Sequence, residues 1–321
     1  MRRHLALLTL LAIAALPGRA AAQFTGTSQI PNFGAPVTGP NQNAPPPDDV
    51  SPLGKSYVSI IDSAVPVNTL RLRLDLGYDM PRSTRAEYFQ AKPGVLLGPG
   101  MLQAEPKIQS YQDLAIYGEF APVPFFSTFI ETPMRWLNPE VNANTYGIGD
   151  INLGFKLAMW NSEDFLASLQ LRFFDPTAQG TGLGTHHWTA DPALLLMWRP
   201  YDNIILEGDV HYWAPLGGTD FAGDILRYGV GISLGSQDSG FWFKPVVEVV
   251  GWSVLGGKQV VATTADSFTV QNASGATIVN GYAGLRFGFG PAFDCYAGYG
   301  RCFTGSIWTR DFARVEVRWF W

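Results

Sequence analysis

The feature that most constrains this chain is an alternation of apolar and polar side chains, which recurs from Asn68 to the C-terminus. In residues 69–79, TLRLRLDLGYD, leucines and a tyrosine alternate with arginine, aspartate and glycine. Successive side chains of a strand point to opposite sides, so this segment predicts a strand with one apolar and one charged face. Such a strand fits a soluble sandwich, whose apolar face covers a core, or a membrane barrel, whose apolar face meets lipid.

Twelve segments carry the alternation, and each can supply the roughly 9–11 residues of a tilted membrane strand. We place them at 68–79, 107–121, 125–135, 146–160, 164–176, 187–199, 203–214, 223–235, 241–254, 276–289, 293–304 and 308–321. The connections after odd-numbered segments have 27, 10, 10, 8, 21 and 3 residues, whereas those after even-numbered segments have 3, 3, 3, 5 and 3. Long loops at one end and tight turns at the other are typical of outer-membrane barrels, and a Greek-key sandwich gives no reason for them. The sequence therefore predicts an all-β fold, a single closed antiparallel transmembrane β-barrel of about 12 strands over residues 68–321.

The N-terminus has the pattern of a secretory signal peptide. A basic start is followed by an apolar run from Leu5 to Leu16 and by Ala20-x-Ala22, which predicts removal of residues 1–22 and a mature chain that begins at Gln23. The alternative is a membrane anchor, but about 12 apolar residues are too few to span roughly 30 Å of hydrocarbon. The sequence thus predicts export, and with the strand pattern it predicts the outer membrane of a Gram-negative-type bacterium.

Composition agrees with a membrane barrel and argues against nucleic acid as a partner. Charged residues make up 15% of the chain, against about 25% in a typical soluble domain. After residue 22 no run approaches 18 consecutive apolar residues, so the sequence predicts no membrane-spanning helix. Removal of the signal takes away three arginines and leaves 19 basic and 27 acidic residues, a net charge of −8. This mild acidity makes nucleic-acid binding an unexpected function.

Residues 23–67 form a leader between the signal and the first strand. Residues 23–54 are rich in proline and show almost no apolar periodicity, which predicts a disordered or extended segment. The following SYVSIIDSAVPV has enough apolar side chains to pack somewhere, as a short helix or as a plug. Because the leader joins the first strand directly, we expect it to reach the lumen, and YVSII at 57–61 is the candidate plug.

The last strand, RVEVRWFW at 314–321, alternates strictly and ends in an aromatic residue. This ending resembles the terminal signal by which the barrel-assembly machinery recognises outer-membrane barrels. The machinery is therefore an expected partner through the C-terminal strand, beside the lipid of the outer membrane. The alternative is an ordinary amphipathic strand.

Two internal stretches carry a resemblance to a known family. YGIGDINLGFKLAMW at 146–160 and GLGTHHWTADPALLLMW at 182–198 resemble the Gly-Asp strand, Gly-rich loop and proline-bearing strand of outer-membrane barrels named for a phenol-degradation pathway (MetA-type). DILRYGVGISL, PVVEVVGWSVLGGK and YAGYGRCFTGSIWTRDFARVEV are similar to other bacterial outer-membrane proteins. The resemblance implies a barrel with a transport role and no established substrate. His186 and His187 stand where that family tends to have small residues, so its loop is not carried over.

Projecting the strands inward predicts a lumen wall with nine cations, ten anions and one histidine. The residues are Arg71, Arg73, Asp75, Asp113, Glu119, Glu131, Asp150, Lys156, Arg172, Asp191, Glu207, Asp209, His211, Arg227, Lys244, Glu248, Arg286, Arg314, Glu316 and Arg318. Opposite charges on neighbouring strands are expected to pair. Two interpretations remain open: a structural network that holds a narrow barrel shut, and a polar conduit.

The sequence offers little for catalysis, metals or cofactors. A serine hydrolase needs a base beside its nucleophile, but the mature chain has only three histidines. His211, expected inward beside Asp209, is interpreted as a lumen hydrogen-bonding group. Cys295 and Cys302, about 23 Å apart along one strand, are too distant for a disulfide. We therefore predict a monomeric passive channel or transporter for a small solute, with no enzyme activity, cofactor or metal; the alternatives are a non-conducting structural barrel and a barrel hydrolase.

Overall fold

A computed structural model describes residues 53–81, 103, 105–235, 240–262, 264 and 267–321. The predicted signal peptide, residues 23–52 of the leader and most of the loop at 80–106 lie outside the described residues. All regular structure in the described part is β-strand. The strands are β1 (Thr69–Met80), β2 (Ile108–Val123), β3 (Phe126–Pro139), β4 (Thr145–Ile148), β5 (Ile151–Asn161), β6 (Phe165–Asp175), β7 (Trp188–Tyr201), β8 (Ile204–Leu216), β9 (Ile225–Leu234), β10 (Phe241–Val254), β11 (Lys258–Ala262), β12 (Phe268–Asn272), β13 (Thr277–Phe289), β14 (Phe293–Cys302) and β15 (Asp311–Phe320).

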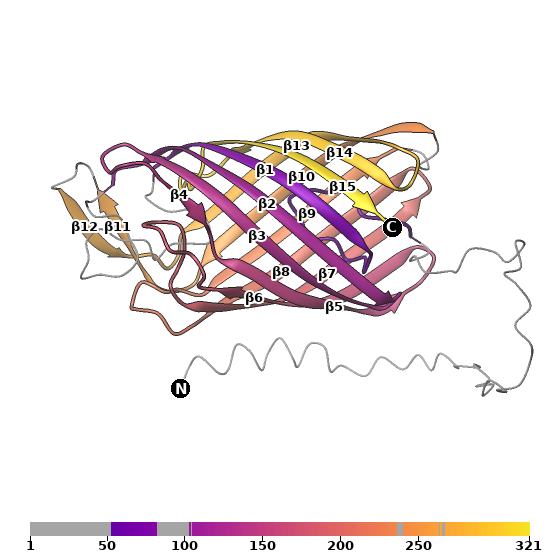
Figure 1. The fold of residues 1–321 in the computed structure, drawn as a ribbon, viewed down its shortest axis with the longest axis horizontal. Coiled ribbons are helices and arrows are strands. Elements are labelled where there is room, and N and C mark those ends of the chain that lie inside the picture. Colours follow the sequence, from indigo (N-terminus) through magenta and orange to yellow (C-terminus); the bar gives the residue numbers. More distant parts are fainter. Residues whose placement is uncertain (1–52, 82–102, 104, 236–239, 263, 265–266) are drawn as a thin grey trace, which may run out of the picture. The chain divides into compact units, whose positions relative to one another are not determined.

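The strands close into one antiparallel barrel. Strand β1 pairs with β2 on one side and with β15 on the other, so the first and last strands of the chain join the ring, as the indigo and yellow strands in Figure 1 show. The order around the ring is β1, β2, β3, β5, β6, β7, β8, β9, β10, β13, β14, β15, and β4 extends the edge of β3 beside β5. The prediction of a closed barrel of 12 strands is confirmed. A closed ring leaves no strand edge unpaired, which is what a strand in lipid requires.

One predicted strand is interrupted. The segment 146–160 divides into β4 and β5, which pair with different parts of β3. Between the two ladders, residues 132 and 133 of β3 face residues 149–151, so one extra residue must bulge out. Pro133 has no N–H to donate, and its carbonyl accepts from Gly149 N at 2.9 Å. The break turns Asp150 toward the loop between β6 and β7.

The two ends of the barrel differ as the loop lengths predict. The turns β2–β3, β5–β6, β7–β8 and β13–β14 lie at one end, called here the tight-turn end, and the longer connections lie at the other, the long-loop end. Two details differ from the prediction. The connection after β14 runs from residue 303 to 310, because Thr304 and Trp308 leave the ladder, and Trp308 is buried. The predicted loop at 255–275 contains the hairpin β11–β12, a separate two-stranded sheet that projects beyond the barrel in Figure 1.

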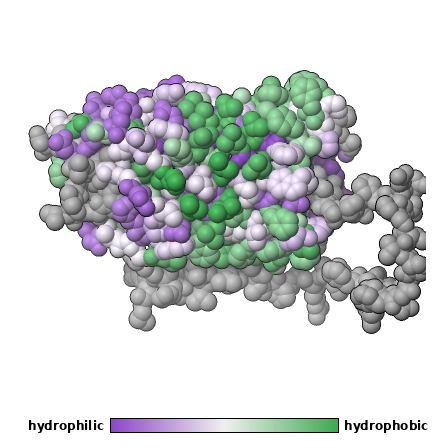
Figure 2. Space-filling view, in the orientation of Figure 1, coloured by the Kyte–Doolittle hydropathy of each residue, from purple (hydrophilic) through white to green (hydrophobic). Residues whose placement is uncertain are grey.

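The outer surface of the barrel is apolar along the strands. Leu70 and Leu72 on β1 are 44% and 47% exposed, and Ile116, Ile130, Val230 and Val315 on other strands face outward in the same way. Figure 2 shows the apolar side chains gathered over the middle and tight-turn part of the barrel, with more polar side chains toward the hairpin end. No described helix is long and apolar enough to cross a membrane. The outward-facing leucines of RLRLDLGYD form the outer, lipid-compatible face of β1.

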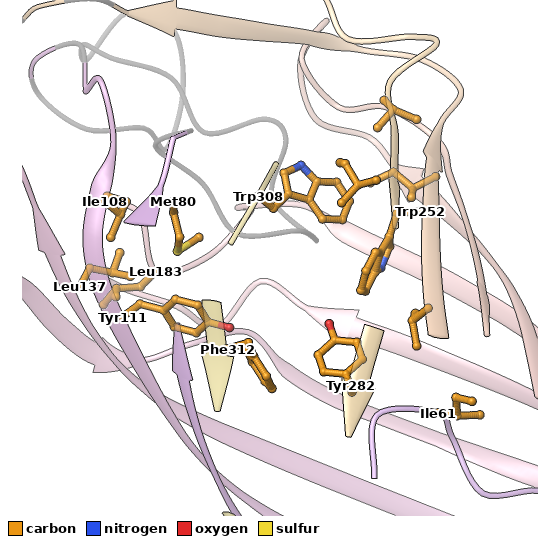
Figure 3. Close-up of a cluster of buried hydrophobic side chains, with 14 of the residues drawn as sticks. Ile61, Met80, Ile108, Tyr111, Leu137, Leu183, Trp252, Tyr282, Trp308 and Phe312 are labelled. Atoms are coloured by element: carbon orange, nitrogen blue, oxygen red, sulfur yellow. The ribbon is translucent and has the colours of Figure 1, made fainter. Parts of the chain in front are cut away.

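An apolar cluster fills the barrel interior at the long-loop end. Figure 3 shows Met80, Ile108 and Leu137 near the ends of β1, β2 and β3, with Tyr111 and Leu183 packed against them. On the opposite side Trp252 meets Trp308 edge-on, with ring centroids 5.3 Å apart. Tyr282 and Phe312 pack in the same way at 5.6 Å. The loop residues Leu183 and Trp308 thus fold inward over the lumen mouth.

Candidate functional site

Most of the charged side chains predicted for the lumen wall are buried, whereas the apolar side chains beside them along each strand are exposed or half-buried. Arg71, Arg73 and Arg172 are half-buried, and the other seventeen predicted residues are buried. Asp150 differs from the rest in its role, because its carboxylate accepts from the N–H and hydroxyl of Thr185 at 2.8 and 3.1 Å in the β6–β7 loop. Alternation along each strand explains the placement, since one face turns inward wherever the other faces out.

One cluster of the wall gathers two arginines around a single carboxylate. On β1, Arg71 donates to Glu131 of β3 at 2.9 Å, and Arg73 donates to both oxygens of the same carboxylate at 3.2 Å. Asn152 of β5 adds a hydrogen bond at 3.3 Å. The Arg71 guanidinium lies over the ring of Tyr117, 4.2 Å from its centroid. Arg73 also lies 3.2 Å from Asp75 and Arg71 3.8 Å from Glu316, so the two cations are shared among three carboxylates.

A second cluster links the last strands of the chain. Arg286 on β13 donates to Asp294 of β14 and to Glu316 of β15, both at 2.7 Å. Arg318 donates to both oxygens of Asp294 at 2.8 and 2.9 Å. The Arg314 guanidinium donates one hydrogen bond to each carboxylate oxygen of Asp75 on β1, at 2.6 and 2.8 Å. The two residues lie directly opposite each other in the β15–β1 ladder. Bidentate arginine–carboxylate pairs are strong and directional, so this cluster also fastens the closing strands.

A third cluster surrounds His211 on β8. One ring nitrogen lies 2.9 Å from Asp191 of β7 and the other 3.2 Å from Asp209, and Arg227 of β9 donates to Asp209 at 2.8 Å. Both nitrogens of this buried imidazole therefore contact carboxylates. A catalytic histidine must offer one nitrogen to a nucleophile, and this arrangement does not.

Residues 53–67, called here the lumen segment, run inside the ring. Lys55 binds Asp294 at 3.3 Å and the carbonyl of Pro291 at 3.1 Å, near the β13–β14 turn. Further along, the Asp62 carboxylate accepts hydrogen bonds from Arg172 at 2.7 Å and from Gln170 at 3.0 Å. Val67 N then lies 3.4 Å from Glu119, back near the tight-turn end where β1 begins. The segment therefore enters from the tight-turn end, turns within the lumen and returns.

Two cavities lie on either side of the lumen segment. One of about 180 Å³ is lined by five arginines, five carboxylates and an aromatic lid that includes Trp252, Trp308 and Phe312 at the long-loop end. The other, of about 30 Å³, is lined by Glu119, Lys156 and Phe320 among others toward the tight-turn end. Asp62, Arg71 and Arg172 line both cavities. These three side chains thus form the partition between two spaces arranged in series along the barrel.

Sequence reasoning missed four charged residues of this wall. Arg135, which donates to Asp113 at 3.0 Å, and Asp294 lie in phase with the inward residues of β3 and β14, so alternation could have found both. Lys55 and Asp62 lie on the lumen segment, outside any strand, and no periodic pattern marks them.

No protein-family model matches the sequence, and a comparison with curated protein sequences finds no match. Solved structures do match. The COG4313 outer membrane channel from Pseudomonas putida F1 is 10% identical and superposes with a TM-score of 0.54 over 87% of this chain and 100% of that chain. The NanC porin is 9% identical, with a TM-score of 0.48 over 78% of this chain and 100% of its own. The KdgM porin is 9% identical, with a TM-score of 0.43 over 79% and 99%. The likeness to the COG4313 channel shows that this chain has the fold of a bacterial outer-membrane β-barrel.

Proposed function

We propose that this chain is a channel of the bacterial outer membrane that passes small polar solutes by passive diffusion, and that the lumen segment closes it in the described state. The observation that carries the proposal is the series of two charged cavities on either side of the lumen segment, within a closed barrel whose outer face is apolar. A polar passage inside an apolar ring is the architecture of a solute channel.

Further support comes from features that the structure leaves untested. The signal-peptide pattern of residues 1–22 accounts for export, and the alternating β15 with its aromatic end accounts for delivery through the barrel-assembly machinery. The resemblance of residues 146–160 and 182–198 to barrels named for a phenol-degradation pathway favours transport. Because β1 and β15 close the ring within one chain, a monomer is a complete barrel.

A second candidate function is a non-conducting structural barrel. The observation that favours it is the density of ion pairing, since Arg286, Arg314 and Arg318 are each shared among carboxylates and main-chain carbonyls. Such a network rigidifies the wall when every member is satisfied. The two functions differ in one measurable property: a barrel that is only structural stays silent when the lumen segment is removed.

Conductance in a planar bilayer separates the two functions. Three purified forms are compared: the mature chain, a deletion of residues 23–67, and a matched deletion of residues 23–52 that keeps the lumen segment. We expect the mature chain and the 23–52 deletion to share a low conductance, and the 23–67 deletion to show a clearly larger one. Heat-modifiable migration in gel electrophoresis checks that each barrel is folded. A folded 23–67 deletion without current contradicts the channel and favours the structural barrel.

A further inference from the structure

Five consecutive peptide carbonyls of the lumen segment accept hydrogen bonds from arginines of the barrel wall. They are Ser56 O from Arg318 at 2.8 Å, Tyr57 O and Val58 O from Arg286 at 2.6 and 2.9 Å, Ser59 O from Arg314, and Ile60 O from Arg227 at 2.7 Å. These contacts reach the main chain, so they do not depend on which side chain the segment carries. Charge-assisted bonds of this kind are stronger than bonds between neutral groups.

Six consecutive peptide N–H groups of the same segment donate to carboxylates. Tyr57 N and Val58 N donate to Glu207 at 3.0 and 3.3 Å, Ser59 N, Ile60 N and Ile61 N to Glu248 at 3.0, 2.8 and 2.9 Å, and Asp62 N to Asp209 at 3.1 Å. From residue 57 to residue 60 the wall therefore binds both the N–H and the C=O of every residue. We call this set of wall residues the main-chain cradle: Glu207, Asp209, Arg227, Glu248, Arg286, Arg314 and Arg318.

Two carboxylates of the main-chain cradle, Glu207 and Glu248, accept hydrogen bonds from peptide N–H groups and form no salt bridge with a described cation. In the part of the chain that the structure describes, no salt bridge joins Glu207 or Glu248 to a lysine or arginine, and the bonds that their oxygens accept come from N–H groups of the lumen segment. A buried carboxylate requires a cation or several hydrogen-bond donors. The arginines of the cradle differ, because each also holds a carboxylate of the wall.

Two apolar side chains of the lumen segment lie directly against glycines of β9, in space that a larger residue would fill. A Cβ added to Gly231 would lie 2.7 Å from Val58 Cγ1, and a Cβ added to Gly229 would lie 3.0 Å from Ile61 Cγ1. The wall thus leaves room for two branched side chains three residues apart. Tyr57 packs edge-on against Trp242 at a centroid distance of 5.8 Å. Ile61 is labelled in Figure 3 on the trace of the segment.

We propose that the main-chain cradle is a peptide-binding site, selective for branched apolar residues at positions i and i+3, which accepts such peptides in trans when the lumen segment is absent. This rests on the proposed function, because it makes short peptides the class of solute that the open barrel recognises. The segment's own sequence, with Val58 and Ile61, shows the ligand pattern that the site takes. Recognition through the main chain leaves the other side chains of a ligand free to vary.

Block of the current by synthetic peptides tests the site. The barrel lacking residues 23–67 is placed in a bilayer, and a peptide with the sequence of residues 53–67 is titrated. Its matched control carries N-methyl groups at Ser59, Ile60 and Ile61, which removes the three donors to Glu248 and keeps every side chain. We expect the parent peptide to block the current and the methylated peptide to need at least about 10-fold more for the same block. In a Glu248→Gln barrel the difference between the two peptides should shrink.

The outcomes separate this inference from the proposed function. If the deleted barrel conducts and no peptide blocks it, or if both peptides block equally, the peptide site is wrong and the channel stands. If the deleted barrel is folded but silent, the channel is wrong, and the site is tested by fluorescence anisotropy of labelled peptide bound to the barrel in detergent. Tighter binding of the parent than of the methylated peptide supports the site in that assay, and equal binding overturns it.

Discussion

Gly231 on β9 offers a single position at which the lumen segment can be displaced without removing a charged group from the wall. Its added Cβ would lie 2.7 Å from Val58 and 3.1 Å from the Cγ of Glu248. The lumen segment is not part of a strand, so it can move away more easily than the ring can deform. The backbone at Gly231 is not left-handed, and a strand accommodates valine well. A larger side chain at this position therefore pushes on Val58 directly and on Glu248, which holds the segment.

We expect Gly231→Val to raise the conductance of the mature chain toward that of the 23–67 deletion. The matched control is Gly118→Val on β2, where an added Cβ meets nothing within 4 Å. Single-channel recording measures both variants, with heat-modifiable migration as the check on folding. If the Gly231→Val barrel folds and its conductance equals that of the parent, the lumen segment is not what limits the current.

The outer face of β1 gives a prediction about lipid. Leu74 lies in the middle of the strand and faces outward between Leu114 of β2 and Val315 of β15. Leu74→Arg is expected to lower the free energy of unfolding in lipid vesicles by about 2–4 kcal/mol, and Leu70→Arg, near the end of the same face, by about 0–1 kcal/mol. Urea titration of both variants measures the difference. Gly77, which faces inward, is unsuitable as a control because its added Cβ would lie 2.1 Å from the Tyr111 ring. Equal effects at the two leucines would contradict a membrane-spanning β1.

At the scale of elements, the barrel strands could be predicted because each one separates an apolar from a polar environment. The sequence of such a strand therefore alternates between apolar and polar residues. The alternation in RLRLDLGYD is sufficient to place Arg71, Arg73 and Asp75 on the inner face. The interruption between β4 and β5 could not be predicted in this way. It accompanies the hydrogen bonds that the Asp150 carboxylate accepts from Thr185, a contact between parts of the chain that only the fold brings together.

The lumen segment shows a second limit of sequence reasoning. Its apolar residues at 57–61 predict that it packs somewhere, and its tether to β1 predicts the lumen. Its attachment, however, uses peptide N–H and C=O groups, which every sequence has. No pattern in the sequence can therefore single out Glu207 and Glu248 from the other carboxylates of the wall.

At the scale of the whole molecule, the two ends of the barrel serve different roles. The long-loop end is covered by inward-folded loop residues such as Leu183 and Trp308, and the tight-turn end receives the lumen segment beside β1. In an outer-membrane barrel long loops face the outside of the cell and tight turns face the periplasm. The aromatic lid then meets the medium first, and the lumen segment enters the barrel from the periplasmic side.

This orientation predicts which tags antibodies reach on intact cells. An epitope inserted after Thr264 lies between β11 and β12, which pair with each other in a sheet separate from the barrel, so the barrel should tolerate it. Its matched control is the same epitope after Glu163, in the turn between β5 and β6 at the opposite end. Because the two sites are at opposite ends of one ring, only the first should be labelled on intact cells, and the second should require permeabilisation of the outer membrane. Labelling of the second epitope alone on intact cells would show that the barrel has the opposite orientation in the membrane, with the entry of the lumen segment on the cell exterior.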